Sequence, residues 1–364
     1  MPPEAGSLRL GILGVGLIGG SIGLAARRRA DAVVCGFDID PRVRDAALAS
    51  GAIDTSSEDL AGAVDGADVV FVAAPVGALL ESVRGALAAA GPECVVTDVG
   101  STKRVLAEAG ADRRFVGGHP LAGAETSGVE HAREDLFDGA TWYLTPSGDT
   151  TGVLYERLHR LLTTIGARPT AIDAETHDRL MACVSHLPHV LANLLVAQAG
   201  ALLGGEESEQ LPAVGPSFRD ATRVAGANSA IWTDIYMSNR DALLEGIDEF
   251  AEALALVREA LAAGDADAVT DWNERARIDR DALLGSRLAG GPLQELRVSV
   301  PNRPGVVAEI ALALGRSGVN IADMALSPSQ DNSQGVVSLW IRGDAPGARA
   351  ERLIAELGHP VARA

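Results

Sequence analysis

The sequence predicts an α/β protein in three parts: a doubly wound domain with a mostly parallel sheet, an all-helical domain, and a small βαββαβ domain. Three observations lead to this prediction. Short β-branched runs alternate with alanine-rich helical runs from residue 8 to about 145, which is typical of a parallel sheet with helices on both faces. Long helical periodicities without strand signals then occupy about 173–288. A second β/α pattern follows LAGGPLQ at 288–294, which has the composition of a linker.

The length of the chain agrees with this division. A chain of 364 residues is too long for one ordinary hydrophobic core and indicates two or three domains. We expect the first domain to span 1–172, the helical domain 173–288 and the C-terminal domain 293–364.

Composition narrows the classes of partner. The formal net charge of −18 argues against nucleic acid or an anionic membrane as the main partner. A small anionic substrate would therefore need basic side chains gathered at one place. The three cysteines, Cys35, Cys94 and Cys183, are far apart and odd in number, so we expect no disulfide framework and a reducing compartment.

Neither apolar run of the chain predicts a targeting or membrane segment. In the N-terminal run LRLGILGVGLIGGSIGLAA, the clustered arginines follow the apolar residues, whereas a secretory signal carries its positive charge before them. The run at 190–203 is interrupted by Asn193 and Gln198 and is too short to span a membrane. We therefore expect a cytoplasmic protein without a membrane partner.

The first domain contains six candidate strands, each a short apolar run. They are Leu8–Leu13, Val33–Phe37, Val69–Ala73, Cys94–Thr97, Phe115–Val116 and Trp142–Leu144.

A glycine-rich loop follows the first strand directly and opens a helix of small residues. Its sequence, GVGLIG at 14–19, has the GxGxxG spacing of dinucleotide-binding Rossmann domains. The first glycine permits a tight turn, the second lets a pyrophosphate approach the backbone, and the third allows close packing of helix on strand. Free N–H groups at the start of the helix can then bind the phosphates. The expected cofactor contacts are Gly14, Gly16, Leu17, Ile18, Gly19, Asp38 and Pro75.

Asp38 ends the next strand in VVCGFD and indicates which cofactor binds. A carboxylate there accepts hydrogen bonds from the ribose hydroxyls of adenosine and repels a 2′-phosphate. Arg42 comes four residues later, so no arginine directly follows the acid. The sequence therefore favours NAD over NADP.

The segment GGHPLAGAE at 117–125 places a histidine at the same sheet edge as the loop. Ligands of open parallel sheets bind outside the carboxyl ends of the strands, where Pro75, Ser101 and His119 all fall. An imidazole there can take a proton at neutral pH, as hydride removal from an alcohol requires. The alternative is a histidine that only bonds its own loop.

Two neighbours of this histidine remain ambiguous from the sequence alone. Ser101 either orients a substrate hydroxyl or caps the helix expected after it. Lys103, the single lysine of the chain, is most simply a solvated residue in the first turn of that helix.

The helical domain offers two further groups. His186 and His189 lie three residues apart on one helical face, and Pro188 predicts a kink by freeing the carbonyl of Val184. No cysteine or carboxylate nearby completes a ligand set, so we expect no metal, and a core role stays open for His186. In FRDATR at 218–223, Asp220 and Arg223 form either a surface ion pair or a site where a guanidinium binds a carboxylate.

Taken together, these segments resemble the prephenate dehydrogenase family over almost the whole chain. The matching pieces are GLIGGS at 16–21, DVGSTK at 98–103, GGHPLAGAE at 117–125, SHLPH at 185–189 and FRDATR at 218–223, in the family's order. The resemblance implies NAD-dependent oxidative decarboxylation of prephenate to 4-hydroxyphenylpyruvate by a homodimer joined through its helical domains.

The resemblance also implies residue roles. His119 matches the catalytic histidine that takes the ring hydroxyl proton, and Ser101 matches the serine that contacts this hydroxyl. His189 and Arg223 match residues that hold substrate carboxylate groups. Glu125 and Asp220 match a pair of acids that order the site.

The C-terminal segment 293–328, with its Pro304-Gly305 turn and GVNI strand, resembles an ACT domain. Such domains bind amino acids near that turn, which implies feedback by tyrosine, with Asn302, Gly305 and Asn320 as candidate contacts. The alternative is a purely structural dimerisation module, because a fold does not establish a ligand.

Three other functions remain to be weighed. Arogenate dehydrogenase has the same fold and chemistry, and the sequence does not separate the two substrates. β-Hydroxyacid dehydrogenases resemble one another in using a lysine of the helical domain, which this chain lacks. A non-catalytic sensor of NAD and amino acids is disfavoured by the presence of His119, Ser101 and Arg223.

Overall fold

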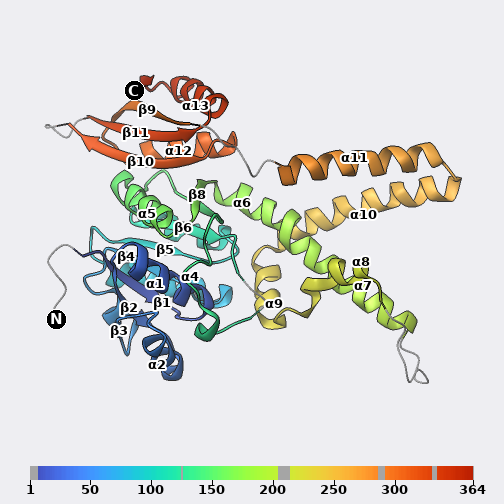
Figure 1. Cartoon of the computed structure of the whole chain (residues 1–364), viewed down its shortest axis with the longest axis horizontal. Helices are drawn as coiled ribbons and strands as arrows, with labels where there is room; N and C mark the ends of the chain where they lie inside the picture. The colour runs from blue at the N-terminus through green and yellow to red at the C-terminus, as the bar shows by residue number, and fades with distance from the viewer. Residues whose placement is uncertain (1–6, 124–125, 204–213, 286–291, 330–333, 364) are drawn as a thin grey trace. The chain divides into compact units, whose positions relative to one another are not determined.

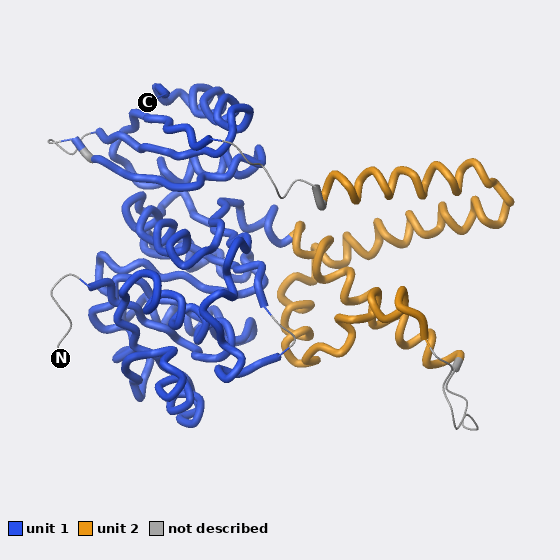
Figure 2. The backbone as a smooth tube through the Cα atoms, viewed as in Figure 1, with its two compact units in different colours: residues 1–178, 292–364 blue, residues 179–291 orange. Residues whose placement is uncertain are grey.

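The computed structural model describes residues 7–123, 126–203, 214–285, 292–329 and 334–363. The chain forms two compact units (Figure 2): residues 1–178 together with 292–364, and residues 179–291. The C-terminal domain therefore belongs to the same unit as the N-terminal domain. The predicted boundaries at 172/173 and 288/293 stay predictions.

An eight-stranded sheet forms the centre of the first unit (Figure 1). Its order is β3-β2-β1-β4-β5-β6-β7-β8, so the chain reverses direction across the sheet between β1 and β4. All neighbours pair parallel except β6 and β7. The strands are β1 (Arg9–Leu13), β2 (Val33–Phe37), β3 (Thr55–Ser56), β4 (Val69–Val72), β5 (Val95–Asp98), β6 (Phe115–Pro120), β7 (Thr141–Thr145) and β8 (Arg168–Ala171).

Helices cover both faces of this sheet, as the alternating pattern predicts. Buried residues of α1, α2 and α5 pack on one face and those of α3 and α4 on the other. The helices of this domain are α1 (Leu17–Arg29), α2 (Pro41–Ala49), α3 (Leu60–Val64), α4 (Val76–Ala89) and α5 (Gly152–Thr164), with 3₁₀ turns at Arg104–Leu106, Ala109–Ala111 and Val129–His131. The doubly wound fold class is confirmed.

Two strands of the sheet escape sequence analysis. The first, β3, is only two residues long. The second, β8, contains Pro169 and Arg168 in place of a β-branched run. Missing β8 affects the prediction of nearby residues, because only two residues separate this strand from helix α6 (Ala174–Met181).

The second unit is helical, as expected. Pro188 lies two residues after the end of a π-helical turn at Ala182–His186, and this wider turn accommodates the missing backbone donor. The helices that follow α6 are α7 (Leu187–Leu203), α8 (Pro216–Thr222), α9 (Ser229–Ser238), α10 (Arg240–Ala263) and α11 (Ala266–Gly285), with a 3₁₀ turn at Arg223–Gly226.

The helical stretch Ala174–Leu202 is long and apolar enough to cross a membrane, with 33% of its most apolar window buried. The expectation of an apolar run too short to span a membrane concerned only 190–203. It is wrong for the helix that contains this run, because that helix begins well before residue 190. Length and composition are weak evidence by themselves, since core helices of soluble proteins pass the same test.

The C-terminal domain has the predicted βαββαβ order, with an antiparallel sheet arranged β10-β11-β9-β12. Its elements are β9 (Leu293–Pro301), α12 (Val306–Arg316), β10 (Ile321–Pro328), β11 (Gln334–Arg342), α13 (Asp344–Glu356) and β12 (Val361–Arg363).

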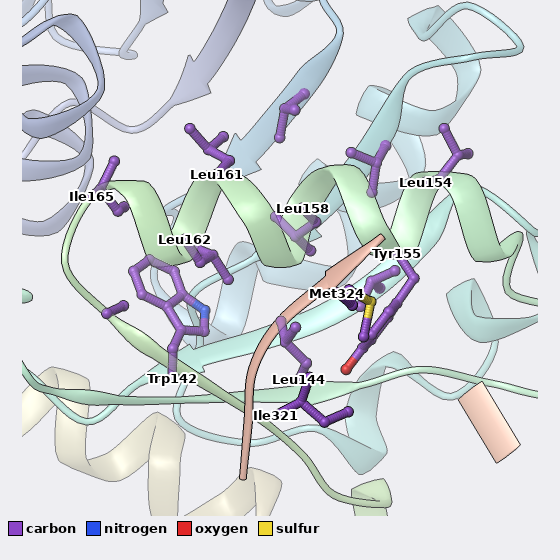
Figure 3. Close-up of a cluster of buried hydrophobic side chains, with 14 of the residues drawn as sticks. Trp142, Leu144, Leu154, Tyr155, Leu158, Leu161, Leu162, Ile165, Ile321 and Met324 are labelled. Carbon is purple, nitrogen blue, oxygen red and sulfur yellow. The ribbon is translucent and has the colours of Figure 1, made fainter. Parts of the chain in front are cut away.

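The core of this domain is continuous with that of the N-terminal domain. Met324 of β10 lies beside Tyr155 of α5, and Ile321 of the same strand lies beside Leu144 of β7 (Figure 3); all four belong to one buried cluster. Burial of such apolar side chains is a main source of folding free energy. The two domains therefore share a core and do not form separate modules on a linker.

A buried histidine at this junction makes the stability of the fold depend on pH. Burial lowers the pKa of His159 in α5 to about 4, so the folded protein keeps the ring neutral while the unfolded chain protonates it near pH 6.5. Stability from this residue is thus lost as pH falls through about 6.5, and the loss is complete near 4. Between pH 6.5 and 5, His159→Phe should lose about 2 kcal/mol less unfolding free energy than the wild type.

Urea unfolding at the two pH values measures this difference. The matched control is His131→Phe, since His131 is exposed and should leave the wild-type pH dependence unaltered. An identical pH slope in His159→Phe and the wild type would contradict the assignment.

Candidate active site

The glycine loop has the geometry that a dinucleotide requires. Gly14 has φ +93°, and a Cβ there would lie 2.5 Å from the carbonyl oxygen of Ala73. A Cβ on Gly19 would lie 1.9 Å from the carbonyl oxygen of Gly14, so only glycine permits this approach of helix to strand. At Gly16 no atom lies within 4 Å of the Cβ position. The loop therefore leaves open space where the pyrophosphate of a dinucleotide approaches the backbone.

Asp38 lies beside this loop at the end of β2. Its carboxylate oxygens accept hydrogen bonds from the backbone N–H groups of Val15 and Asp40, each at 3.1 Å. Arg42 is paired with Asp40 at 2.7 Å, and Arg44 donates to the carbonyl oxygen of Asp38. The carboxylate thus stands at the loop without an arginine paired to it in the described structure.

The other expected cofactor contacts surround the same strand ends. Leu17 and Ile18 are the first residues of α1, for which Gly16 is the N-cap, and Pro75 is the N-cap of α4 after β4. Sequence analysis overlooked Ile39, an apolar side chain that is 91% exposed directly after Asp38. An exposed apolar residue at this position is suited to cover a planar base.

A buried ion pair joins the ends of β5 and β6. Lys103 pairs with Asp98, and both side chains are fully buried. Asp98 accepts hydrogen bonds from the backbone N–H of Gly100 at 2.8 Å and of Gly118 at 3.0 Å. Lys103 also donates to the carbonyl oxygen of Gly118 at 2.7 Å. The pair therefore fixes both backbone groups of the residue that precedes His119.

The expectation that Lys103 is solvated is wrong. The turn that follows DVGS is a 3₁₀ helix over Arg104–Leu106 capped by Lys103, so the lysine side chain turns inward to Asp98. Ser101 is partly buried and does not cap this turn, which leaves the interpretation that it orients a substrate hydroxyl.

His119 is the first member of a buried line of three side chains. Its Nδ1 lies 2.9 Å from Nε2 of His177, and Nδ1 of His177 lies 2.8 Å from a carboxylate oxygen of Asp178. Asp178 also accepts hydrogen bonds from the backbone N–H groups of Lys103 and Arg104 at 2.8 and 2.9 Å. The line thus connects β6, the loop after β5 and helix α6.

The charges of this line follow from its partners. Burial by itself raises the pKa of the Asp178 carboxyl. The hydrogen bonds from His177, Arg104 and Lys103 together lower it by more than burial raises it, so the net pKa is below its usual range. Burial lowers the pKa of His177, against the opposing hydrogen bond to Asp178. At neutral pH Asp178 is therefore ionised and His177 is neutral.

These charges assign the tautomers. The ionised Asp178 can only accept, so His177 carries its proton on Nδ1 and presents a lone pair at Nε2. His119 must then donate from its Nδ1, and its basic nitrogen is Nε2. The arrangement orients an imidazole for proton transfer in the way that a carboxylate orients the histidine of a hydrolase triad.

The second unit contains the other histidines of interest. His189 stacks on Trp232 with ring centroids 3.6 Å apart and 2° between the planes, and its Nδ1 contacts the hydroxyl of Tyr236 and the side chain of Asn193. His186 is buried, and its Nδ1 lies 3.2 Å from the side-chain nitrogen of Asn239, which supports the core interpretation of this residue.

The remaining predicted residues lie in different settings. Asp220 in α8 and Arg223 at the start of the following 3₁₀ turn are both exposed. Glu125 lies outside the described residues. Within the described part of the chain, no group of three or more metal-binding side chains occurs.

Sequence analysis missed four residues of these two groups. His177 and Asp178 follow β8 closely, and recognising that strand would have placed them near the sheet edge. Trp232 and Tyr236 are spaced i,i+4 in a chain with 4% aromatic residues, so their spacing on one helical face was the available signal.

Comparison with known proteins identifies each part of the chain. Family models match the nucleotide-binding domain of prephenate dehydrogenase over 22–171, its dimerization domain over 173–274 and an ACT domain over 295–347. The chain is 34% identical over 358 residues to a prephenate dehydrogenase of Bacillus subtilis, with 94% of each chain covered.

Two solved structures are also similar. Prephenate dehydrogenase of Aquifex aeolicus, in complex with hydroxyphenyl propionate and NAD+, has a TM-score of 0.69 and 28% identity, covering 77% of this chain and 100% of that one. Arogenate dehydrogenase of Synechocystis has a TM-score of 0.66 and 26% identity, covering 76% and 100%.

Removing the lysine of the buried pair should destabilise the protein strongly. Lys103→Met leaves the Asp98 carboxylate buried without its cation, which should lower the unfolding free energy by about 3–5 kcal/mol. Urea unfolding measures the loss. Arg84→Met, which breaks exposed ion pairs with Glu81 and Glu108, should cost at most about 1 kcal/mol. Equal small losses in both variants would show that the Asp98–Lys103 pair does not hold the strand ends.

Proposed function

The chain belongs to the prephenate dehydrogenase family, and from this membership we propose that it oxidises prephenate with NAD, releasing CO2 and forming 4-hydroxyphenylpyruvate. It is an NAD-dependent dehydrogenase. The tight turn at Gly14, the open space at Gly16 and the carboxylate of Asp38 fit that cofactor.

The line from Asp178 through His177 to His119 is the observation that supports this reaction. The bound cofactor supplies the hydride acceptor. His119 takes the proton of the ring hydroxyl at Nε2, because its Nδ1 is bonded to His177. The positive charge that develops on His119 is stabilised through His177 by the ionised Asp178. Loss of CO2 with aromatisation supplies the driving force, so alignment and one proton acceptor are the protein's main tasks.

Five side chains are proposed to bind the substrate or to order its site. Ser101 contacts the ring hydroxyl, and His189 and Arg223 hold the carboxylate groups of the substrate. Arg223 supplies the local cation that a chain of net charge −18 needs for an anion, whereas burial lowers the pKa of His189, which therefore binds as a neutral ring. Glu125 and Asp220 order the site. The short contacts of His189 with Trp232 and Tyr236 keep its ring in one orientation, which supports a binding role.

We propose that the enzyme is a soluble, cytoplasmic homodimer joined through its helical domains. The match of the dimerization-domain model over 173–274 supports this assembly. So do the large apolar side chains exposed on α10 and α11, which include Leu254, Leu256, Leu261, Trp272 and Ile278.

Arogenate is the second candidate substrate. It carries an amino group where prephenate carries the side-chain keto group, and the reacting ring is the same. Similarity to the arogenate dehydrogenase of Synechocystis favours testing it. Initial rates of NADH formation with each substrate separately decide between them, and no turnover of either would support a sensor.

Tyrosine is the proposed effector of the ACT domain. Two of its candidate contacts already bind the N-terminal domain: the N–H of Gly305 donates to the carbonyl oxygen of Thr150 at 3.1 Å, and Asn320 accepts from the hydroxyl of Thr170 at 3.2 Å. Asn302 is exposed. Tyrosine that uses Gly305 or Asn320 would therefore compete with these contacts.

Replacing the proposed base should abolish most turnover without weakening the cofactor. His119→Asn keeps a donor for His177 but has no basic nitrogen, so kcat should fall by roughly 10²–10⁴-fold while the NAD dissociation constant stays within error. Steady-state rates and a fluorescence titration measure the two quantities. His131→Asn, at an exposed histidine, is the matched control, and near-normal kcat in His119→Asn would remove His119 from this role.

Tyrosine at millimolar concentration should lower the initial rate and raise the melting temperature of the full chain. A ligand at about 100 times its Kd adds about 2.7 kcal/mol to the stability of the state it binds. D-Tyrosine, tested side by side, controls for non-specific effects. If L-tyrosine changes neither rate nor melting temperature, regulation through the ACT domain is ruled out and the structural role remains.

A further inference from the structure

We propose that Arg316 of the ACT domain is a positioning residue for the proposed base His119, acting through the capped start of helix α6. The inference rests on the proposed function, since it concerns the same imidazole. It gives the docked ACT domain a direct part in the geometry of the reaction.

The end of α12 lies against the strand that leads into α6. A Cβ on Gly315 would lie 1.9 Å from the carbonyl oxygen of Ala171, the last residue of β8. Such an approach of backbone to backbone is open only to glycine. Asn320, just after α12, bonds Thr170 of the same strand at 3.2 Å. Two contacts therefore hold the ACT domain against the final residues of β8.

Arg316, the neighbour of Gly315, reaches the next segment of that chain. Its Nε donates to a carboxylate oxygen of Asp173 at 3.2 Å. Asp173 in turn caps helix α6, because its carboxylate accepts the backbone N–H and the hydroxyl of Thr176, each at 2.8 Å. Arg316 therefore binds the residue that begins the helix.

The capped turn carries the line to the base. The backbone N–H of His177 donates to the carbonyl oxygen of Asp173 at 2.9 Å, so Asp173 places His177 directly. His177 then contacts His119 at 2.9 Å and Asp178 at 2.8 Å. From Arg316 to His119 the path consists of Asp173, the first turn of α6 and His177.

The exposure of the Arg316–Asp173 pair makes it possible to distinguish an effect on the position of His119 from an effect on folding stability. The Arg316 side chain is 59% exposed and that of Asp173 26%, and exposed pairs contribute little to folding. A change at Arg316 should therefore leave the melting temperature in place and alter the reaction. A misplacement of about 1 Å in a catalytic group can cost about 10²-fold in rate.

The test compares Arg316→Ala with Arg316→Lys and with Arg297→Ala. Arg297 pairs with Glu295 of the same ACT strand at side-chain exposures of 60% and 24%, which match those of the Arg316 pair. Arg316→Ala should lower kcat about three- to tenfold. It should also shift the acidic limb of the pH–rate profile to lower pH, because a displaced His177 weakens the hydrogen bond that stabilises the protonated ring of His119. The KM for NAD should stay constant, Arg316→Lys should restore most of the rate, and Arg297→Ala should behave as the wild type.

A double-mutant cycle locates the effect. Asp173→Asn retains a capping side chain but loses the charge, so it should reproduce Arg316→Ala, and the double variant should be no slower than either single one. Additive losses would contradict the path through Asp173. So would a wild-type kcat and pH profile in Arg316→Ala, or an equal loss in Arg297→Ala.

A readout without turnover separates this inference from the proposed function. The ring ¹⁵N signals of His177 in the full chain should move in Arg316→Ala and stay unchanged in Arg297→Ala. Movement with no wild-type turnover of prephenate or arogenate would overturn the proposed function and retain the positioning path. Unmoved signals in an active enzyme would overturn the positioning path alone.

Discussion

The carboxylate of Asp178 is the group on which the geometry of the candidate active site depends. It accepts two backbone N–H groups from the loop after β5 and the Nδ1–H of His177, and through His177 it reaches His119 at the end of β6. A buried carboxylate with these donors stays ionised. Its charge therefore orders two imidazole rings in sequence and leaves one nitrogen, Nε2 of His119, as the basic atom. Without that charge neither tautomer would be determined.

Two further constraints support this line from opposite sides. The buried pair of Asp98 and Lys103 binds both backbone groups of Gly118, which fixes the position of the next residue, His119, at the sheet edge. On the other side, the start of α6 is held by Asp173. The ACT domain contacts that segment and shares a core with α5, so a domain expected either to regulate or to serve as a dimerisation module also lies against the element that carries His177. Catalytic geometry and the ACT contact are thus joined through one turn of helix.

The sequence predicted those features that follow from local rules. The GxGxxG spacing and the strand-end rule placed Gly14, Asp38 and His119 at one sheet edge, and the structure has all three there. The sequence did not predict the burial of Lys103, because a lysine after Gly-Ser-Thr at the start of a helical turn is ordinarily solvated. Its partner Asp98 becomes apparent only when the end of the folded strand is seen. His177 was missed because β8 contains proline and arginine and lacks a strand pattern. The contact of Trp232 with His189 joins two helices far apart in sequence, which periodicity alone cannot pair.

The tautomer of His119 tests the central claim most directly. Histidine-labelled protein, with signals assigned through His119→Asn and His177→Asn, gives the protonation of each ring nitrogen from ¹⁵N shifts at neutral pH. The orienting line from Asp178 predicts that both His119 and His177 are neutral with the proton on Nδ1. A proton on Nε2 of neutral His119 would contradict it, because the basic nitrogen would then face His177 and not the substrate.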